Sequence, residues 1–145
     1  MNGSQPRSIV PVVIGIALTA ALLLGLVLVT SKRNAEENAV PSLTVLAPLP
    51  QSTTDSPLVV RFRSAQPLQL GTSGWGYQQL HLHAWLNDVQ YMPAASDVRR
   101  LADGSYQWSL PAVPRGPVTL RLGWADARHR PLAAGASQDI TATLQ

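Results

Sequence analysis

The 145-residue chain carries a formal net charge of +3, and charged residues make up 13% of it, about half the share that is usual in a soluble domain. It has no cysteine, which excludes a disulfide framework, a thiolate metal site and a cysteine nucleophile. From Pro41 onward eight arginines stand against six aspartates, a near-neutral balance, so we expect no nucleic-acid partner.

The uncharged stretch Ile9–Val29 accounts for the low share of charge. As an α-helix it would be about 31 Å long, close to the hydrocarbon thickness of a bilayer. The alternative, a cleaved secretory signal, normally has a shorter apolar region and a small-x-small cleavage site, which Val29-Thr30-Ser31 does not provide. We therefore predict one uncleaved transmembrane helix.

This helix divides the chain into four predicted parts. They are a short N-terminal tail over residues 1–8, the transmembrane helix over 9–30, a stalk over 31–41 and a β domain over 42–145. Within the helix, Ala17, Ala21 and Gly25 form a small-residue stripe, a pattern that favours close packing against partner helices.

The flanking charges decide the orientation only weakly. Arg7 precedes the helix, and Lys32 and Arg33 follow it, so the positive-inside rule slightly favours a cytoplasmic domain. A hydrophobic segment that begins so near the N-terminus acts, however, as a signal anchor and sends the following chain across the membrane. We expect a single-pass protein of a bacterial inner membrane, with a cytoplasmic N-terminus and a periplasmic domain.

After Pro41 the apolar residues recur with the period of two that is typical of β-strands. Two hairpin turns are expected, at Asn87-Asp88 and Asp103-Gly104. Seven or eight short strands with Pro/Gly turns between them predict an all-β domain, an immunoglobulin-like antiparallel β-sandwich. Its core would be filled by Trp85, Trp108 and Trp124. The predicted strands are Ser42–Ala47, Leu58–Arg63, Gln79–Asn87, Val89–Met92, Val98–Leu101, Ser105–Leu110, Val118–Trp124 and Asp139–Leu144.

One stretch, Ser64–Gln78, fits no strand and is predicted to be a long loop. Three glycines surround Trp75 and Tyr77, and no charged residue occurs between Ala65 and Gln78. Aromatic residues are enriched at interaction hot spots, so we expect Trp75 and Tyr77 to contact a partner or the lipid headgroups. The alternative is a loop folded back on its own core.

His81 and His83 are the candidate metal ligands. Strand alternation places both side chains on one face, roughly 7 Å apart, and His129 from the loop Ala125–Pro131 could add a third imidazole. Alternatively, the pair lines a half-buried strand or an interface. The Leu-x-His-x-His strand and the later Asp-Ala-Arg-His loop resemble small periplasmic copper-carrying sandwiches, without their N-terminal histidine and Met-rich segments.

Catalysis has little support in the sequence. Asp126 and His129 could form a general-base pair, but no G-x-S-x-G motif or paired-carboxylate pattern accompanies them. We expect no enzymatic activity and no cofactor.

The overall plan, one anchor and one small β domain without a catalytic motif, resembles accessory subunits of bacterial bioenergetic complexes, either respiratory assemblies or photosynthetic reaction-centre–antenna complexes. The resemblance covers the whole chain but rests on no motif, so no functional residue follows from it. It implies a non-catalytic structural subunit that packs its helix into a larger integral membrane complex and docks its sandwich on it. The alternatives are a membrane-anchored copper- or ligand-binding module that uses the His81/His83 strand, and a free-standing adhesion or sensing domain.

Overall fold

The computed structural model describes residues 39–110 and 113–145, and Val40–Gln145 form one compact unit. The predicted tail, the transmembrane helix with Ala17, Ala21 and Gly25, and most of the stalk lie outside the described residues. Within them, no helix has the length and apolar character needed to cross a bilayer.

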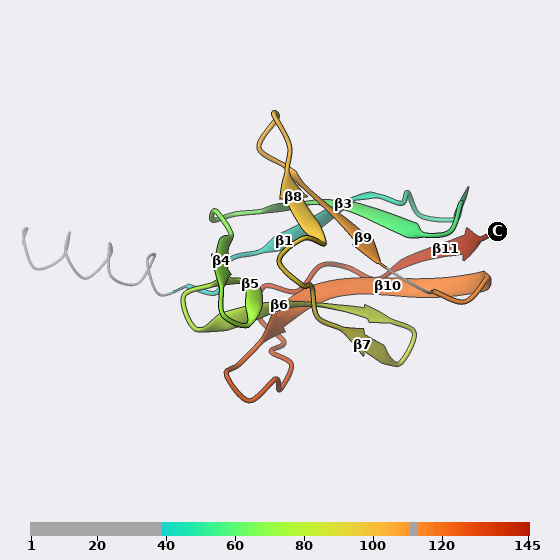
Figure 1. Ribbon diagram of the computed structural model, residues 1–145. Coiled ribbons are helices and arrows are strands. Elements are labelled where there is room, and N and C mark those ends of the chain that lie inside the picture. Colours follow the sequence, from blue (N-terminus) through green and yellow to red (C-terminus); the bar gives the residue numbers. More distant parts are fainter. Residues whose placement is uncertain (1–38, 111–112) are drawn as a thin grey trace, which may run out of the picture. The chain divides into compact units, whose positions relative to one another are not determined.

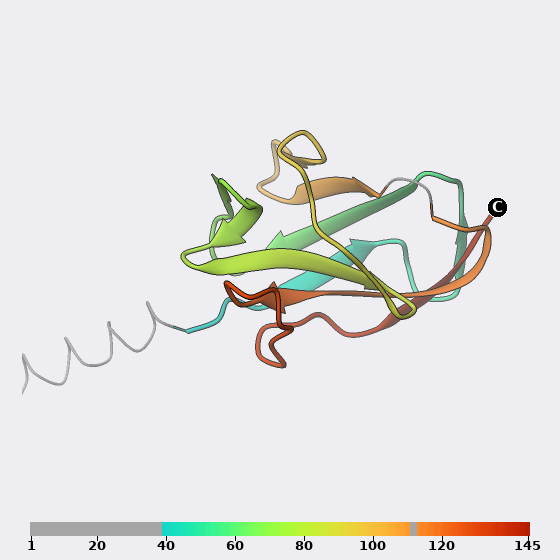
Figure 2. The same cartoon turned by 60° about the horizontal axis from the view of Figure 1, so that its bottom comes forward.

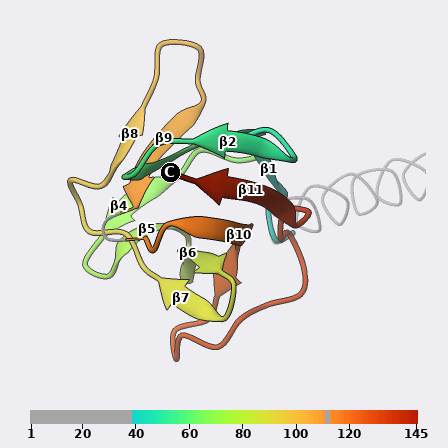
Figure 3. The ribbon, with the colours of Figure 1, turned by 90° about the vertical axis from the view of Figure 1, so that its right-hand side faces the viewer.

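The described unit is a sandwich of two β-sheets (Figures 1 and 2). The smaller sheet has the order β1 (Leu43–Ala47), β3 (Leu58–Ser64), β9 (Tyr106–Leu110), β8 (Val98–Arg100). The larger sheet has the order β2 (Ser52–Thr54), β11 (Ile140–Leu144), β10 (Gly116–Ala125), β6 (Leu80–Leu86), β5 (Gly74–Tyr77), β4 (Gln69–Gly71), and β7 (Val89–Tyr91) also pairs with β6. All pairings are antiparallel except that of β2 with β11, which lie side by side in Figure 3. The predicted all-β class is confirmed.

Alternation builds the core between the sheets. In β3, Leu58, Val60 and Phe62 have no exposed surface, while the residues between them point outward. Strand β10 contributes Leu120 and Leu122 from the other sheet, also with no exposed surface. Each fully buried side chain of this size stabilises the fold by about 1.5–3 kcal/mol relative to exposure, which explains why the period-two pattern locates these strands correctly.

Two of the three tryptophans predicted in the core lie there. Trp108 and Trp124 are 1% and 0% exposed. The prediction for Trp85 was wrong, because Trp85 alternates with the inward-facing Ala84 and Leu86 and therefore lies on the outer face of the larger sheet. It packs against β10, where a Cβ at Gly123 would come within 2.9 Å of its ring.

The prediction of a structureless loop over Ser64–Gln78 was also wrong. The stretch contains the β4–β5 hairpin, in which Gln69 pairs with Gly76 and Gly71 with Gly74. Its glycines are required by close contacts, because a Cβ at Gly74 would clash with the Pro93 carbonyl oxygen and one at Gly76 with that of Leu80. With β2, which is short and polar, this hairpin raises the number of strands above the predicted seven or eight.

Both predicted hairpin turns are confirmed. Asn87 and Gly104 adopt positive φ angles of 52° and 79° in the β6–β7 and β8–β9 turns. Asp103 stabilises the second turn by accepting hydrogen bonds from the backbone and hydroxyl of Ser105, and it pairs with Arg61. These bonds, those to Ser105 first, hold the pKa of Asp103 well below its usual range.

The first residues of the domain are held by Trp124. Its indole Nε1 donates a 2.6 Å hydrogen bond to the carbonyl oxygen of Pro41. Beside it, Gly135 adopts φ = 74° and accepts a hydrogen bond from Leu43 N. A Cβ at Gly135 would lie 2.9 Å from the Trp124 ring, so this glycine leaves room for the contact.

A pair of substitutions tests the value of the Trp124 hydrogen bond. Both Trp124→Phe and Trp108→Phe remove similar buried volume, but Trp108 Nε1 has no hydrogen-bond partner among the described residues. Only Trp124→Phe leaves a buried carbonyl unpaired, which costs about 1–3 kcal/mol. We expect Trp124→Phe to lower the free energy of unfolding by about that much more than Trp108→Phe. Equal losses in urea unfolding would contradict this account.

Candidate functional site

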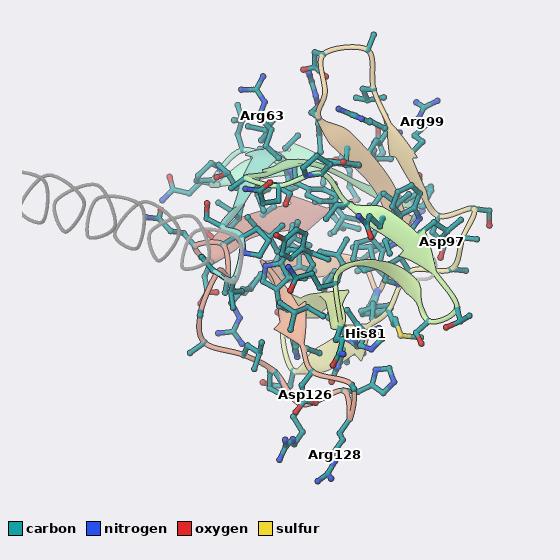
Figure 4. The ribbon with its side chains drawn as sticks, turned by 90° about the vertical axis from the view of Figure 1, so that its left-hand side faces the viewer. Arg63, His81, Asp97, Arg99, Asp126 and Arg128 are labelled. Atoms are coloured by element: carbon teal, nitrogen blue, oxygen red, sulfur yellow. The ribbon has the colours of Figure 1, made fainter. Side chains whose placement is uncertain are left out.

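All three histidines of the chain meet on the outer face of the larger sheet. His81 and His83 come from β6, and His129 comes from the loop between β10 and β11. His83 Nε2 lies 3.4 Å from His129 Nδ1, and the His129 ring stacks on His81 with centroids 5.0 Å apart. Figure 4 shows His81 on the same side of the domain as the loop that carries Asp126 and Arg128. We call these three residues the histidine cluster.

The loop that carries His129 is held by Asp126. Its carboxylate accepts hydrogen bonds from the backbone N–H groups of Arg128 and Arg130, at 2.9 and 3.0 Å, and pairs with the Arg130 guanidinium at 2.7 Å. The bonds from Arg130 are the main reason why the pKa of Asp126 falls to about 2. His129 adopts φ = 59° within this turn.

Asp126 therefore organises the loop, and the general-base pair considered from the sequence does not form in the described structure. The carboxylate of Asp126 contacts arginines, whereas the ring of His129 faces His81 and His83.

His83 lies at the centre of the cluster and is 2% exposed. Its Nδ1 is 2.6 Å from the side-chain amide of Gln90 in β7, and its ring stacks on Trp85 at 5.7 Å between centroids. Arg121 lies over the Trp85 ring, 5.6 Å from its centroid. Burial, then repulsion from His129 and His81, lowers the pKa of His83 from 6.5 to about 4, so the ring is neutral at pH 7.

The cluster is not a preformed metal cage. In the part of the chain that the structure describes, no three histidine, aspartate or glutamate side chains are arranged to hold an ion as they stand. The stacked rings of His81 and His129 are the physical reason, since imidazole lone pairs lie in the ring plane and those of two stacked rings do not converge.

Trp75 and Tyr77, the predicted interface aromatics, are half-buried in β5. The Trp75 ring packs edge-on against Tyr106 at 6.2 Å, and its Nε1 donates a 3.3 Å hydrogen bond to the Ala95 carbonyl. Part of each aromatic side chain thus contributes to the domain itself, as in the folded-back alternative, and part remains exposed.

Leu70, which no sequence pattern indicated, is 53% exposed on the edge strand β4. The β4–β5 hairpin, with Leu80 and His81, lines a hollow of about 140 Å³. The sequence feature that could have indicated this exposed edge is the lack of charge, because no Asp, Glu, Lys or Arg occurs from Ser64 to Asn87.

The depressed pKa of His83 predicts a pH-dependent stability. Unfolding raises this pKa from about 4 to about 6.5, so the unfolded state binds the proton first as the pH falls. The stabilisation is complete above pH 6.5 and is lost as the pH falls towards 4. Between pH 7.5 and 5 we expect His83 to account for a loss of about 1–2 kcal/mol. His83→Gln, which stays neutral, should show a shallower pH dependence in urea unfolding, and an unchanged dependence would contradict the assignment.

Comparisons with known proteins give no family for the chain. No protein-family model and no curated protein matches it. Among solved structures, an endo-β-1,4-mannanase from Thermotoga petrophila is similar over 74% of this chain with 12% identity and a TM-score of 0.45, and the match covers 20% of the mannanase chain. Fibronectin(III)-like modules of Clostridium thermocellum CbhA are similar over 70% of this chain and 93% of theirs, with 11% identity and a TM-score of 0.37.

Proposed function

We propose that the protein is a non-catalytic accessory subunit that docks its β-sandwich on a larger integral membrane complex. Ile9–Val29 anchors it in a bacterial inner membrane, with the N-terminus in the cytoplasm and the domain in the periplasm. Ala17, Ala21 and Gly25 pack against partner helices. We propose a respiratory or photosynthetic complex as the partner, because the plan of one anchor and one small β domain resembles accessory subunits of such complexes.

The observation that carries the proposal is the exposed, uncharged edge strand β4. Gln69, Leu70 and Gly71 are all exposed, and β4 lies at the end of the larger sheet. An open edge presents unpaired N–H and C=O groups, and soluble proteins normally protect such edges with charge. One edge strand of the smaller sheet, β8, follows that rule and carries the exposed Arg99 and Arg100, whereas the other, β1, is uncharged and less exposed.

The strand order supports an immunoglobulin-like type for the sandwich. The order β1-β3-β9-β8 in one sheet, and β11-β10-β6 in the other, corresponds to the pairing of strands in constant-type immunoglobulin domains. In this arrangement the β4–β5 hairpin is an addition beside β6. We assign the docking contact to this hairpin, with Leu70 and the exposed parts of Trp75 and Tyr77.

Leu70→Asp tests the docking edge. Leu70 is more than half exposed, so a charge there leaves the fold intact but must be desolvated when a partner covers the edge. Desolvating an unpaired charge is costly, and we expect at least a roughly tenfold weaker association, about 1.4 kcal/mol. The measurement is co-purification of the full-length chain from membranes in mild detergent, with the partner subunits identified by mass spectrometry.

Leu49→Asp is the matched control. Leu49 is 65% exposed and precedes β2, at the opposite edge of the same sheet. We expect it to co-purify as the wild type does. Equal loss in both variants, or no loss in either, would refute the assignment of the edge. A wild-type chain that migrates alone on native gels would refute the accessory role.

A further inference from the structure

The gathering of every histidine in the chain at one place has no role in the docking proposal. Two of them are neighbours on a strand, but His129 is 46 residues away from His83 along the sequence. A structural ion pair or capping bond would need one histidine at most. Imidazole nitrogens are the preferred ligands of Zn²⁺, Cu²⁺ and Ni²⁺, whereas Mg²⁺ and Ca²⁺ prefer oxygen.

We propose that the histidine cluster binds one divalent transition-metal ion, with Cu²⁺ bound most tightly, through His83 Nε2, His129 Nδ1 and a nitrogen of His81. Affinities for nitrogen sites rise from Mn²⁺ to Cu²⁺ and fall again at Zn²⁺. The metal site and the docking edge are separate proposals, so either can fail without the other.

The separation of the first two ligands suits a metal ion. His83 Nε2 and His129 Nδ1 are 3.4 Å apart. Two nitrogens that bind Zn²⁺ at about 2.1 Å with a near-tetrahedral angle are also about 3.4 Å apart, and the tetragonal geometry that Cu²⁺ prefers requires the exposed His129 ring to move closer to His83. In the metal-free state the two nitrogens lie within hydrogen-bond distance of one another. The ion can take the place of the hydrogen between them when the donor ring carries its hydrogen on the other nitrogen, a change of tautomer that needs no net loss of a proton.

Gln90 in β7 contacts the ring nitrogen of His83 that would not bind the ion. A ligating histidine usually donates its second ring N–H to an oxygen, which fixes the tautomer and the orientation of the ring. The side-chain amide nitrogen of Gln90 lies 2.6 Å from His83 Nδ1, so His83 Nε2 becomes available to the ion when this amide turns over and its oxygen accepts the hydrogen of Nδ1. Trp85 packs on the same ring and limits its rotation, so His83 is the fixed ligand of the site.

The rings of His81 and His129 have to rotate for the site to bind an ion. Their stacked rings must turn apart before both can bind the ion, which is why the residues do not already form a cage. His129 is exposed and His81 half-exposed, so rotation about their side-chain bonds meets little packing. Asp126 keeps the backbone of the His129 turn in place during that rotation and is a positioning residue.

Titration of the full-length chain with Cu²⁺ in nonionic detergent at pH 7.5 tests the proposal. We expect one equivalent to bind in calorimetry, with tryptophan fluorescence quenched in parallel because Trp85 packs on His83. Electron paramagnetic resonance should show hyperfine splitting from imidazole nitrogens. Zn²⁺ should bind at the same site more weakly and compete with Cu²⁺.

The variants separate this site from other copper ligands, including the N-terminal amine. His129→Gln changes an exposed side chain and should leave the fold intact while weakening binding at least tenfold, and His81→Gln should weaken it by less. Asp126→Asn should weaken binding without removing the imidazole signal. Arg128→Gln, the exposed neighbour of His129, is the matched control and should bind as the wild type does. No binding by the wild type, or equal binding by the wild type, His129→Gln and His81→Gln, would overturn the proposal.

Discussion

The hydrogen bond from Trp124 to Pro41 connects the parts of the domain on which the rest depends. The buried indole N–H of Trp124 donates to the carbonyl oxygen of Pro41, whereas the buried indole N–H of Trp108 has no partner among the described residues. Trp124 is also nearly the last residue of β10, the longest strand described and the one that joins β6 to β11. One contact thus fixes the point where the chain joins the sandwich and the point where β10 gives way to the loop of His129.

The two faces of β6 carry different kinds of side chain. Leu82, Ala84 and Leu86 point inward and are almost fully buried. His81, His83 and Trp85 take the other face, where β7 and the His129 loop cover them in part. A one-residue shift in the pairing with β10 would exchange the two sets, so the hydrophobic core itself keeps the histidine cluster on the outside.

Local patterning was sufficient for the main strands but not for the features that depend on distant contacts. Alternation located eight of the strands described, and the turn residues at Asn87 and Gly104 were correct. The β4–β5 hairpin was missed because Gly74 and Gly76 look like loop residues, while their real constraint is contact with Pro93 and Leu80. His129 was named as a possible third ligand, but its place beside His83 depends on the Asp126 turn, which sequence spacing does not encode.

His81 belongs to the histidine cluster and also lies beside the β4–β5 hairpin. It stacks on His129 within the cluster, and it also lines the hollow of the β4–β5 hairpin. Anything that fills the hollow therefore touches a residue whose ring must turn for the cluster to change. Two ligands that meet at such a shared residue are thermodynamically coupled, and each alters the affinity of the other by the same factor. A partner at the hairpin edge and an ion at the proposed metal site would therefore influence one another through His81.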